Sequence, residues 1–226
     1  GYPWYRDPEI RSTNGFPWAQ NIAQRAGMLQ GEHLRKLDPV AYVQERYLDT
    51  IRDADILPGT GEEDKRIKEL VVLNQSWFMQ TLLDRKDRMS MYNGLEVRVP
   101  FCDHRIAEYL YGVPWEYKNY MGREKGLLRY AVRDILPKEI VERKKSPYPK
   151  TYDPNYLKLV TDALQKVIAD EKEPIHQIVS KSALETVLQE EHTWPWYGQL
   201  MAGPQMTAYL LQINFWLKEY QIEIAL

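Results

Sequence analysis

The chain has 226 residues, of which 44% are hydrophobic and 27% are charged, and this balance excludes an intrinsically disordered protein. Its 30 basic and 32 acidic side chains give a formal net charge of −2, which argues against a general binder of nucleic acids or anionic membranes. No apolar run approaches the roughly 20 residues of a membrane span. A single cysteine cannot form an internal disulfide, so we expect a cytoplasmic protein.

Helical periodicity dominates the chain from its first third to its end, and we find no internal repeat. Pro39 suits the first turn of one of these helices, because its missing N–H has no partner there in any case. The pattern predicts helices at residues 16–30, 39–56, 62–90, 104–111, 123–135, 138–143, 154–170, 175–190 and 205–220. We therefore expect a mainly α fold with at most one short strand. Residues 1–226 are interpreted as one domain, with a candidate sub-domain seam near residue 150.

The one strand signal lies between the predicted helices at 62–90 and 104–111. Leu95, Val97 and Val99 alternate with Glu96 and Arg98, which is typical of a short strand with one buried face. Pro100 then withholds a ladder donor and ends the strand. Asp103 stands where an N-cap belongs, directly before the next helical pattern. We expect Glu96, Arg98 and Asp103 to lie around a tight polar corner.

This region resembles a signature of a known enzyme family. Residues 87–103, DRMSMYNGLEVRVPFCD, are similar to the DRMSMAHSLEVRVPFLDHR segment of glutamine-dependent asparagine synthetases. Residues 123–129 (REKGLLR) match the family's KxLLR helix, and residues 143–149 (RKKSPYP) match the stretch that follows it. Gly1 and Tyr2 match the end of the family's SGEGADEVFGGY segment. The departures are Cys102, where leucine is usual, and Tyr92 to Gly94, and neither removes a charged group.

The resemblance implies the helical C-terminal portion of an α/β adenine-nucleotide synthetase domain of the pyrophosphate-loop type, with its parallel sheet upstream of Gly1. The family's N-terminal glutaminase domain and its Ser-Gly-Gly-x-Asp-Ser phosphate loop have no counterpart in these residues. We therefore expect the C-terminal part of a longer enzyme, inactive by itself and prone to self-association. The resemblance implies that the parent enzyme uses ATP and Mg²⁺. We expect no cofactor bound to this chain and no Mg²⁺ ligand within it.

By resemblance, the parent enzyme adenylates the β-carboxylate of aspartate, and ammonia released from glutamine then converts β-aspartyl-AMP into asparagine. Two alternatives stay open. One is a related ATP-dependent amide ligase, similar to β-lactam synthetases, that acts on another carboxylate. The other is a non-catalytic helical interaction module. The coding sequence upstream of Gly1 would discriminate among the three.

Lys125 is the strongest candidate for a catalytic residue. On a helix over 123–136 it projects into the apolar arc of Leu127, Leu128, Ala131, Val132, Ile135 and Leu136. Burial of an unpaired ammonium is costly, so periodicity alone favours a snorkelling lysine at a helix end. The family resemblance favours the other interpretation. It implies that Lys125 contacts phosphate and the negative charge that develops during adenylation and amide formation.

Further cations follow Lys125 along the chain. Arg129 and Arg133 form a cationic edge that either meets an anion or pairs with Glu124 or Asp134. Arg143, Lys144 and Lys145 gather at the end of a predicted helix, where the helix dipole alone would favour cations. The resemblance implies that Arg129 and the run from Arg143 to Lys145 assist with the phosphates of the nucleotide.

The remaining site candidates are expected to line the substrate site. They are Tyr2, which follows the family's acidic segment, and Glu96, Arg98 and Asp103. For the three corner residues, structural ion pairs and caps are the competing interpretation. The four histidines are scattered without metal-ligand spacing, so we predict no metal site.

Overall fold

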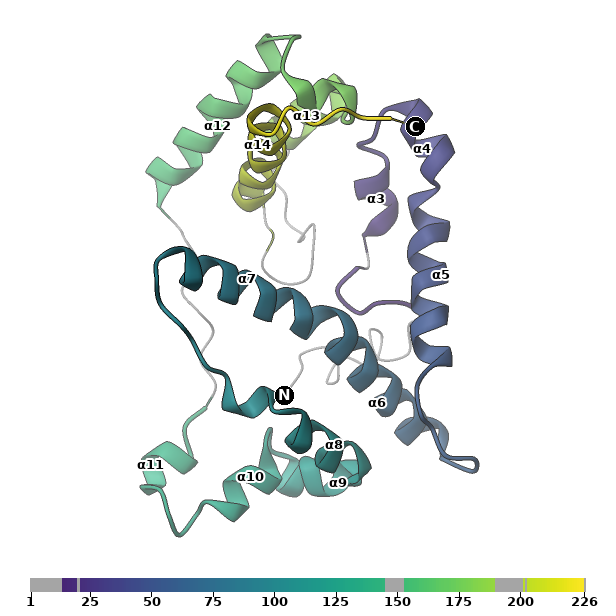
Figure 1. The fold of residues 1–226 in the computed structure, drawn as a ribbon, viewed down its shortest axis with the longest axis vertical. Helices are drawn as coiled ribbons and strands as arrows, with labels where there is room; N and C mark the ends of the chain where they lie inside the picture. Colours follow the sequence, from purple (N-terminus) through teal and green to yellow (C-terminus); the bar gives the residue numbers. More distant parts are fainter. Residues whose placement is uncertain (1–13, 20, 145–152, 190–200, 202, 226) are drawn as a thin grey trace. The chain divides into compact units, whose positions relative to one another are not determined.

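The computed structural model describes residues 14–19, 21–144, 153–189, 201 and 203–225, shown in Figure 1. Within these residues the chain is helical, and no β-strand forms: β pairing is limited to isolated bridge residues, among them the antiparallel pair Leu29 and Val179. The expectation of a mainly α fold with at most one short strand is confirmed. None of the described helices is long and apolar enough to cross a membrane. The chain divides into two compact units, which we describe separately.

The first unit holds the described residues from 47 to 144, and its longest element is a nearly unbroken helix. It consists of α6 (Glu62–Leu73), a π-helical stretch η1 (Asn74–Met79) and α7 (Gln80–Tyr92), which continue one another in Figure 1. This run confirms the helix predicted at 62–90. Acidic residues in its first turn stabilise the helix, because their negative charge lies at the positive end of the helix dipole.

The buried face of α6 forms the core of the first unit. Ile67, Leu70 and Leu73 are buried at helical spacing, as their period predicts. Tyr47 in the second half of α5 (Pro39–Arg52) is also buried, and its hydroxyl accepts a hydrogen bond of 3.0 Å from Arg66 Nη1. Burial raises the pKa of the Tyr47 phenol, because the phenolate would be poorly solvated there. The phenol therefore stays neutral.

The strand predicted at residues 95–99 does not form in the structure. No extended segment of the described residues pairs with it, and an extended run without a ladder partner is not a strand. The segment passes instead through the 3₁₀ turn η2 (Pro100–Cys102) into α8 (His104–Gly112). Asp103 is the N-cap of α8, as predicted: its Oδ1 accepts a hydrogen bond of 2.9 Å from the Arg105 N–H.

Four short elements end the first unit. They are α9 (Trp115–Lys118), η3 (Tyr120–Gly122), α10 (Gly126–Ala131) and α11 (Lys138–Val141). The helix predicted at 123–135 was too long, because it starts at Gly126 and ends at Ala131. Met121, Gly122 and Lys125 have a left-handed backbone conformation, so a helix cannot continue through them, and α10 begins only after Lys125.

The second unit combines residues up to 46 with the C-terminal part of the chain. Its helices are α3 (Ile22–Ala26), α4 (Gly31–Leu37), the first half of α5, α12 (Pro154–Ala169), α13 (Lys181–Gln189) and α14 (Gly203–Glu219), with the 3₁₀ turn η4 (Pro174–Gln177). The helices predicted at 154–170 and 205–220 are confirmed, and the one at 175–190 is divided into η4 and α13. The helix predicted at 16–30 shrinks to α3.

A compact core holds the second unit together. Leu164, Ile175 and Leu184 are fully buried and come from α12, η4 and α13. The N-terminal segment joins this core through two backbone hydrogen bonds, from Gln30 N to Ile178 O at 2.7 Å and from Ser180 N to Met28 O at 2.9 Å. Contacts between residues that are far apart in the sequence therefore hold this unit together.

Candidate functional site

A solvent-open hollow of about 360 Å³ lies in the first unit beside α10 and α11. Its lining combines four cations, one carboxylate and an apolar floor: Lys125, Arg129, Arg143, Lys144, Glu124, Leu128, Val132, Leu136, Ile140 and Val141. The structure therefore brings together four of the five cations predicted to act on phosphate. The fifth, Lys145, lies outside the described residues.

Lys125 occupies the N-cap of α10 in a left-handed conformation, with φ 56° and ψ 32°. The helical projection that placed it on a buried stripe was therefore wrong. Its side chain is exposed, and it makes no hydrogen bond or ion pair with the described residues. The ammonium is an unpaired positive charge at the edge of the hollow.

Gly126 explains why the chain turns at this point. A Cβ at Gly126 would lie 2.5 Å from both the backbone N and O of Tyr120, closer than real Cβ contacts come. The backbone of α10 therefore starts directly against η3, which only glycine permits. The ring of Tyr120 also packs edge-on against Tyr130, with centroids 5.3 Å apart. These contacts fix the turn that carries Lys125.

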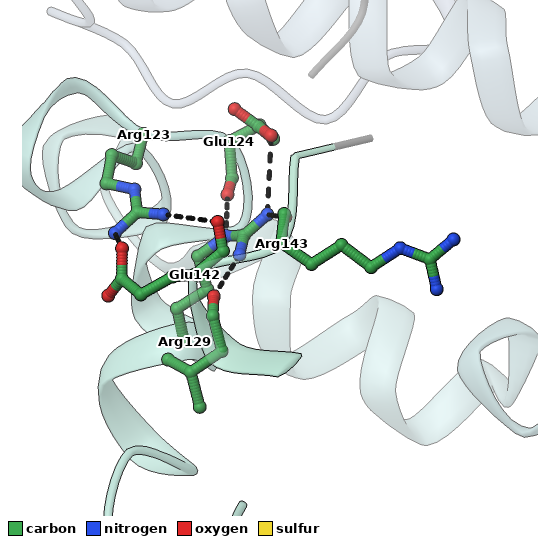
Figure 2. A network of polar contacts seen from close by, with 6 residues as sticks. Arg123, Glu124, Arg129, Glu142 and Arg143 are labelled. Atoms are coloured by element: carbon green, nitrogen blue, oxygen red, sulfur yellow. Dashed lines mark hydrogen bonds and ion pairs between the residues drawn. The ribbon is translucent and has the colours of Figure 1, made fainter. Parts of the chain in front are cut away.

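Arg129 is held inside the wall of the hollow, as Figure 2 shows. Its side chain is only 15% exposed. Its Nε donates to the Glu124 carbonyl at 2.9 Å, and its Nη2 lies 3.3 Å from Glu124 Oε1. Nη1 donates to the Val141 carbonyl, and Nη2 donates to the Arg143 carbonyl at 2.9 Å. The pairing with Glu124, one of the two interpretations of this arginine, is present.

Two residues that sequence reasoning did not single out complete this network. Arg123 Nη1 lies 2.5 Å from Glu142 Oε2, and its Nη2 donates to the Glu142 carbonyl at 3.5 Å (Figure 2). The partners are 19 residues apart in sequence, so the spacing of three or four residues that predicts ion pairs along a helix does not predict this pair. The only signal in the sequence was their opposite charge.

Arg143 and Lys144 follow the end of α11 and are exposed. Figure 2 shows the Arg143 side chain extending away from the Arg129 network, although its carbonyl belongs to that network. Within the part of the chain that the structure describes, neither side chain forms an ion pair. Arg133, by contrast, already has partners. Its Cζ lies 3.7 Å from the centroid of the Tyr130 ring, and its Nε lies 3.4 Å from Asp134 Oδ2.

The predicted substrate-lining residues do not line this hollow. Glu96 and Arg98 are exposed and form an ion pair of 2.7 Å with each other. Asp103 caps α8, and the guanidinium of Arg105 holds the pKa of its carboxyl below the usual value. These contacts are the structural caps and pairs that formed the competing interpretation. Tyr2 lies outside the described residues.

Among the described residues there is no group of three or more histidine, cysteine, aspartate or glutamate side chains that could hold a metal ion. What the hollow offers is a set of fixed positive charges around an apolar floor. Such a set suits a polyanion with several oxygens, because phosphate oxygens accept charge-assisted hydrogen bonds from ammonium and guanidinium groups.

A family model and similar relatives indicate the same protein family. A family model described as asparagine synthase matches residues 1–218. The glutamine-hydrolyzing asparagine synthetase 3 of Bacillus subtilis (strain 168) is 44% identical over 99% of this chain. The match covers 37% of that relative's length, so the chain spans little more than a third of it. A human glutamine-hydrolyzing asparagine synthetase is 45% identical over 69 residues, which cover 28% of this chain and 12% of the human protein.

Proposed function

Because this chain belongs to the asparagine synthase family, we propose that it is part of an ATP-dependent ligase that makes asparagine from aspartate and glutamine-derived ammonia. A β-carboxylate oxygen of aspartate attacks the α-phosphorus of ATP, and the bond to pyrophosphate breaks as β-aspartyl-AMP forms. Ammonia then attacks the acyl carbon and loses a proton, and AMP leaves with the electrons of the acyl–oxygen bond. The glutaminase activity and the remaining nucleotide contacts belong to other parts of the complete protein.

The observation that carries the proposal is the set of three cations without acidic partners around one hollow. Lys125, Arg143 and Lys144 all line it, and none forms an ion pair with a described residue. Unpaired like charges in one place repel one another, and an anionic ligand would offset that repulsion. We assign this hollow to the phosphates of ATP and the departing pyrophosphate, with Lys145 as a further contributor.

Lys125 is the proposed catalytic residue of this set. It stands on a turn fixed by the close approach of Gly126 to Tyr120, so its charge is presented from a defined position. A cation held beside developing negative charge lowers the barrier without reorganising during the reaction. Mg²⁺ that accompanies ATP would add further positive charge at the phosphates, and we assign no ligand for it in this chain.

The test uses the complete protein that carries this chain. We expect Lys125→Ala to lower pyrophosphate release by about 100-fold to 1,000-fold, because a fixed electrostatic stabiliser is lost. Lys125→Arg should also be poor, since a planar guanidinium does not replace a compact ammonium. Glutamine hydrolysis should stay close to normal in both variants.

The matched control is Arg133→Ala, which removes a cation four residues beyond Arg129 that is already stacked and paired. We expect this variant to turn over normally. Near-normal pyrophosphate release by Lys125→Ala would contradict the assignment of Lys125 and of this hollow to the reaction. Activity with a carboxylate other than aspartate would instead favour the related amide ligase.

A further inference from the structure

Arg129 connects the two segments that carry the unpaired cations. One segment contains Glu124 and leads directly into Lys125, and the other contains Val141 and Arg143 and leads into Lys144. The guanidinium donates to a carbonyl of the first segment and to two carbonyls of the second (Figure 2). The second segment begins at the last residue of α11, so α10 and most of α11 separate the two segments along the chain, and their meeting at one side chain is a tertiary contact.

The contacts of Arg129 leave its guanidinium little capacity for a ligand. Arginine has five N–H donors. Four of its hydrogen bonds are to Glu124, Val141 and Arg143, and three of those are to backbone carbonyls. A phosphate that took these donors would leave the part-buried carbonyl groups of Glu124 and Val141 without partners, which is costly.

A second tie runs parallel to the first. Arg123 binds both the carboxylate and the carbonyl of Glu142. Residues 123 and 129, on either side of Lys125, are thus joined to residues 141–143. Loosening either tie would let the Lys125 turn and the Arg143 segment move apart.

We propose that Arg129 is a positioning residue that holds Lys125 and the Arg143–Lys144 segment at the same hollow, and that it does not bind phosphate itself. The proposal rests on the proposed function, because it takes this hollow as the polyphosphate site. A lysine cannot take over this role. Its single nitrogen cannot reach three carbonyls that a planar guanidinium spans.

The experiment compares Arg129→Lys with Arg133→Lys in the complete protein. For Arg129→Lys we expect the kcat of pyrophosphate release to fall by about 10-fold to 100-fold, because small displacements of a catalytic group are costly. The KM for MgATP should stay within about threefold, since ground-state binding by the other cations persists. Arg133→Lys should change neither constant.

Hydrogen exchange of the ligand-free protein provides the second readout. Arg129→Lys should speed amide exchange at residues 141–144, and Arg133→Lys should leave it unchanged. A raised KM with normal kcat and unchanged exchange would mean that Arg129 binds phosphate directly, which overturns the proposal. Normal kcat, KM and exchange would overturn it as well.

Two further variants distinguish a failure of the positioning role from a failure of the proposed function. Glu142→Ala removes the exposed carboxylate that binds Arg123 in the parallel tie, so it serves if Arg129→Lys does not fold. A lower kcat with faster exchange at residues 141–144 supports the proposal, and unchanged values overturn it. Lys125→Ala tests the site itself. If it retains turnover, the proposed function of the hollow fails. If it loses turnover while Arg129→Lys behaves normally, only the positioning role fails.

Discussion

The charged residues around the hollow divide into two groups by what they contact. Arg123 and Arg129 are engaged with Glu142, Glu124 and backbone carbonyls, and they act as structural cross-links. Lys125 and the cations that follow α11 are exposed and have no ion-pair partner in the described residues. Paired arginines stabilise a local arrangement, whereas unpaired cations at a shared surface are available to a ligand. The same residue types therefore serve two purposes within about twenty residues of chain.

Gly126 is the residue on which the geometry of the Lys125 turn depends. We expect Gly126→Ala to lower the free energy of unfolding by about 1–3 kcal/mol, because a Cβ would overlap the Tyr120 backbone and force the chain apart. The measurement is urea unfolding of residues 1–226, followed by circular dichroism.

Gly112→Ala is the control for this substitution. Gly112 ends α8, and nothing lies within 4 Å of the position that its Cβ would occupy. This change should be neutral, or stabilise by up to about 1 kcal/mol through helix propensity. An equal loss of stability in both variants would show that the contact with Tyr120 is not responsible for the effect.

For Lys125, motif resemblance predicts a catalytic role that stays a prediction, and the helical projection gave a wrong position for the residue. The projection assumed a helix from 123, but left-handed residues at 121, 122 and 125 interrupt the chain. Lysine and methionine rarely adopt that conformation, so nothing local predicted it. The close approach at Gly126 is a tertiary contact, and such contacts are not encoded in spacing.

Among the helices, those with long apolar periodicity were the best predicted. The α6–α7 run, α12 and α14 match the predicted ranges closely. In α6, α12 and α14 apolar side chains are buried on one face, and such packing supplies most of the stability of a helix. The strand at 95–99 failed for a different reason. Alternation indicates an extended backbone, but a strand also needs a partner, which a single segment cannot specify.

A polar cluster on α14 links this helix to η4 in the second unit. Asn214 Oδ1 accepts a hydrogen bond of 3.1 Å from Ile175 N, and its Nδ2 donates to Glu173 Oε2 at 2.7 Å. Lys218 Nζ also donates to Glu173 Oε1 at 2.6 Å. Hydrogen bonds from Lys218 and Asn214 hold the pKa of the Glu173 carboxyl below its ordinary value.

This shift makes the second unit sensitive to acid. Because the folded pKa is lower than the unfolded one, the ionised carboxylate stabilises the fold above the ordinary pKa of glutamate, about 4.3. That stabilisation disappears as the pH falls through the lower folded pKa. We expect the urea midpoint of Glu173→Gln to depend less on pH than that of the parent chain between about pH 6 and pH 3. Parallel pH profiles for the two proteins would contradict this role.

At the scale of the whole molecule, exposed apolar side chains are the feature that needs a partner. Around the end of α7 and along α8, several large hydrophobic residues face solvent: Met89, Met91, Tyr92, Leu95, Phe101 and Tyr109. Large apolar surfaces left exposed in this way often mark sites of contact with another protein segment. The family relative from Bacillus subtilis is much longer than this chain. We expect other parts of the complete protein to cover these side chains.

Residues 1–226 expressed by themselves should therefore associate through this surface. We expect light scattering at micromolar concentration to report dimers or larger species, and a hydrophobic dye to bind. Replacing Phe101 and Tyr109, which are 74% and 72% exposed, with glutamate should shift the chain toward monomer, because charge at an apolar contact must be desolvated on association. Glutamate at Phe215, a 66% exposed residue of α14 in the second unit, provides the comparison and should have less effect. A clean monomer that binds no dye would show that these side chains need no cover.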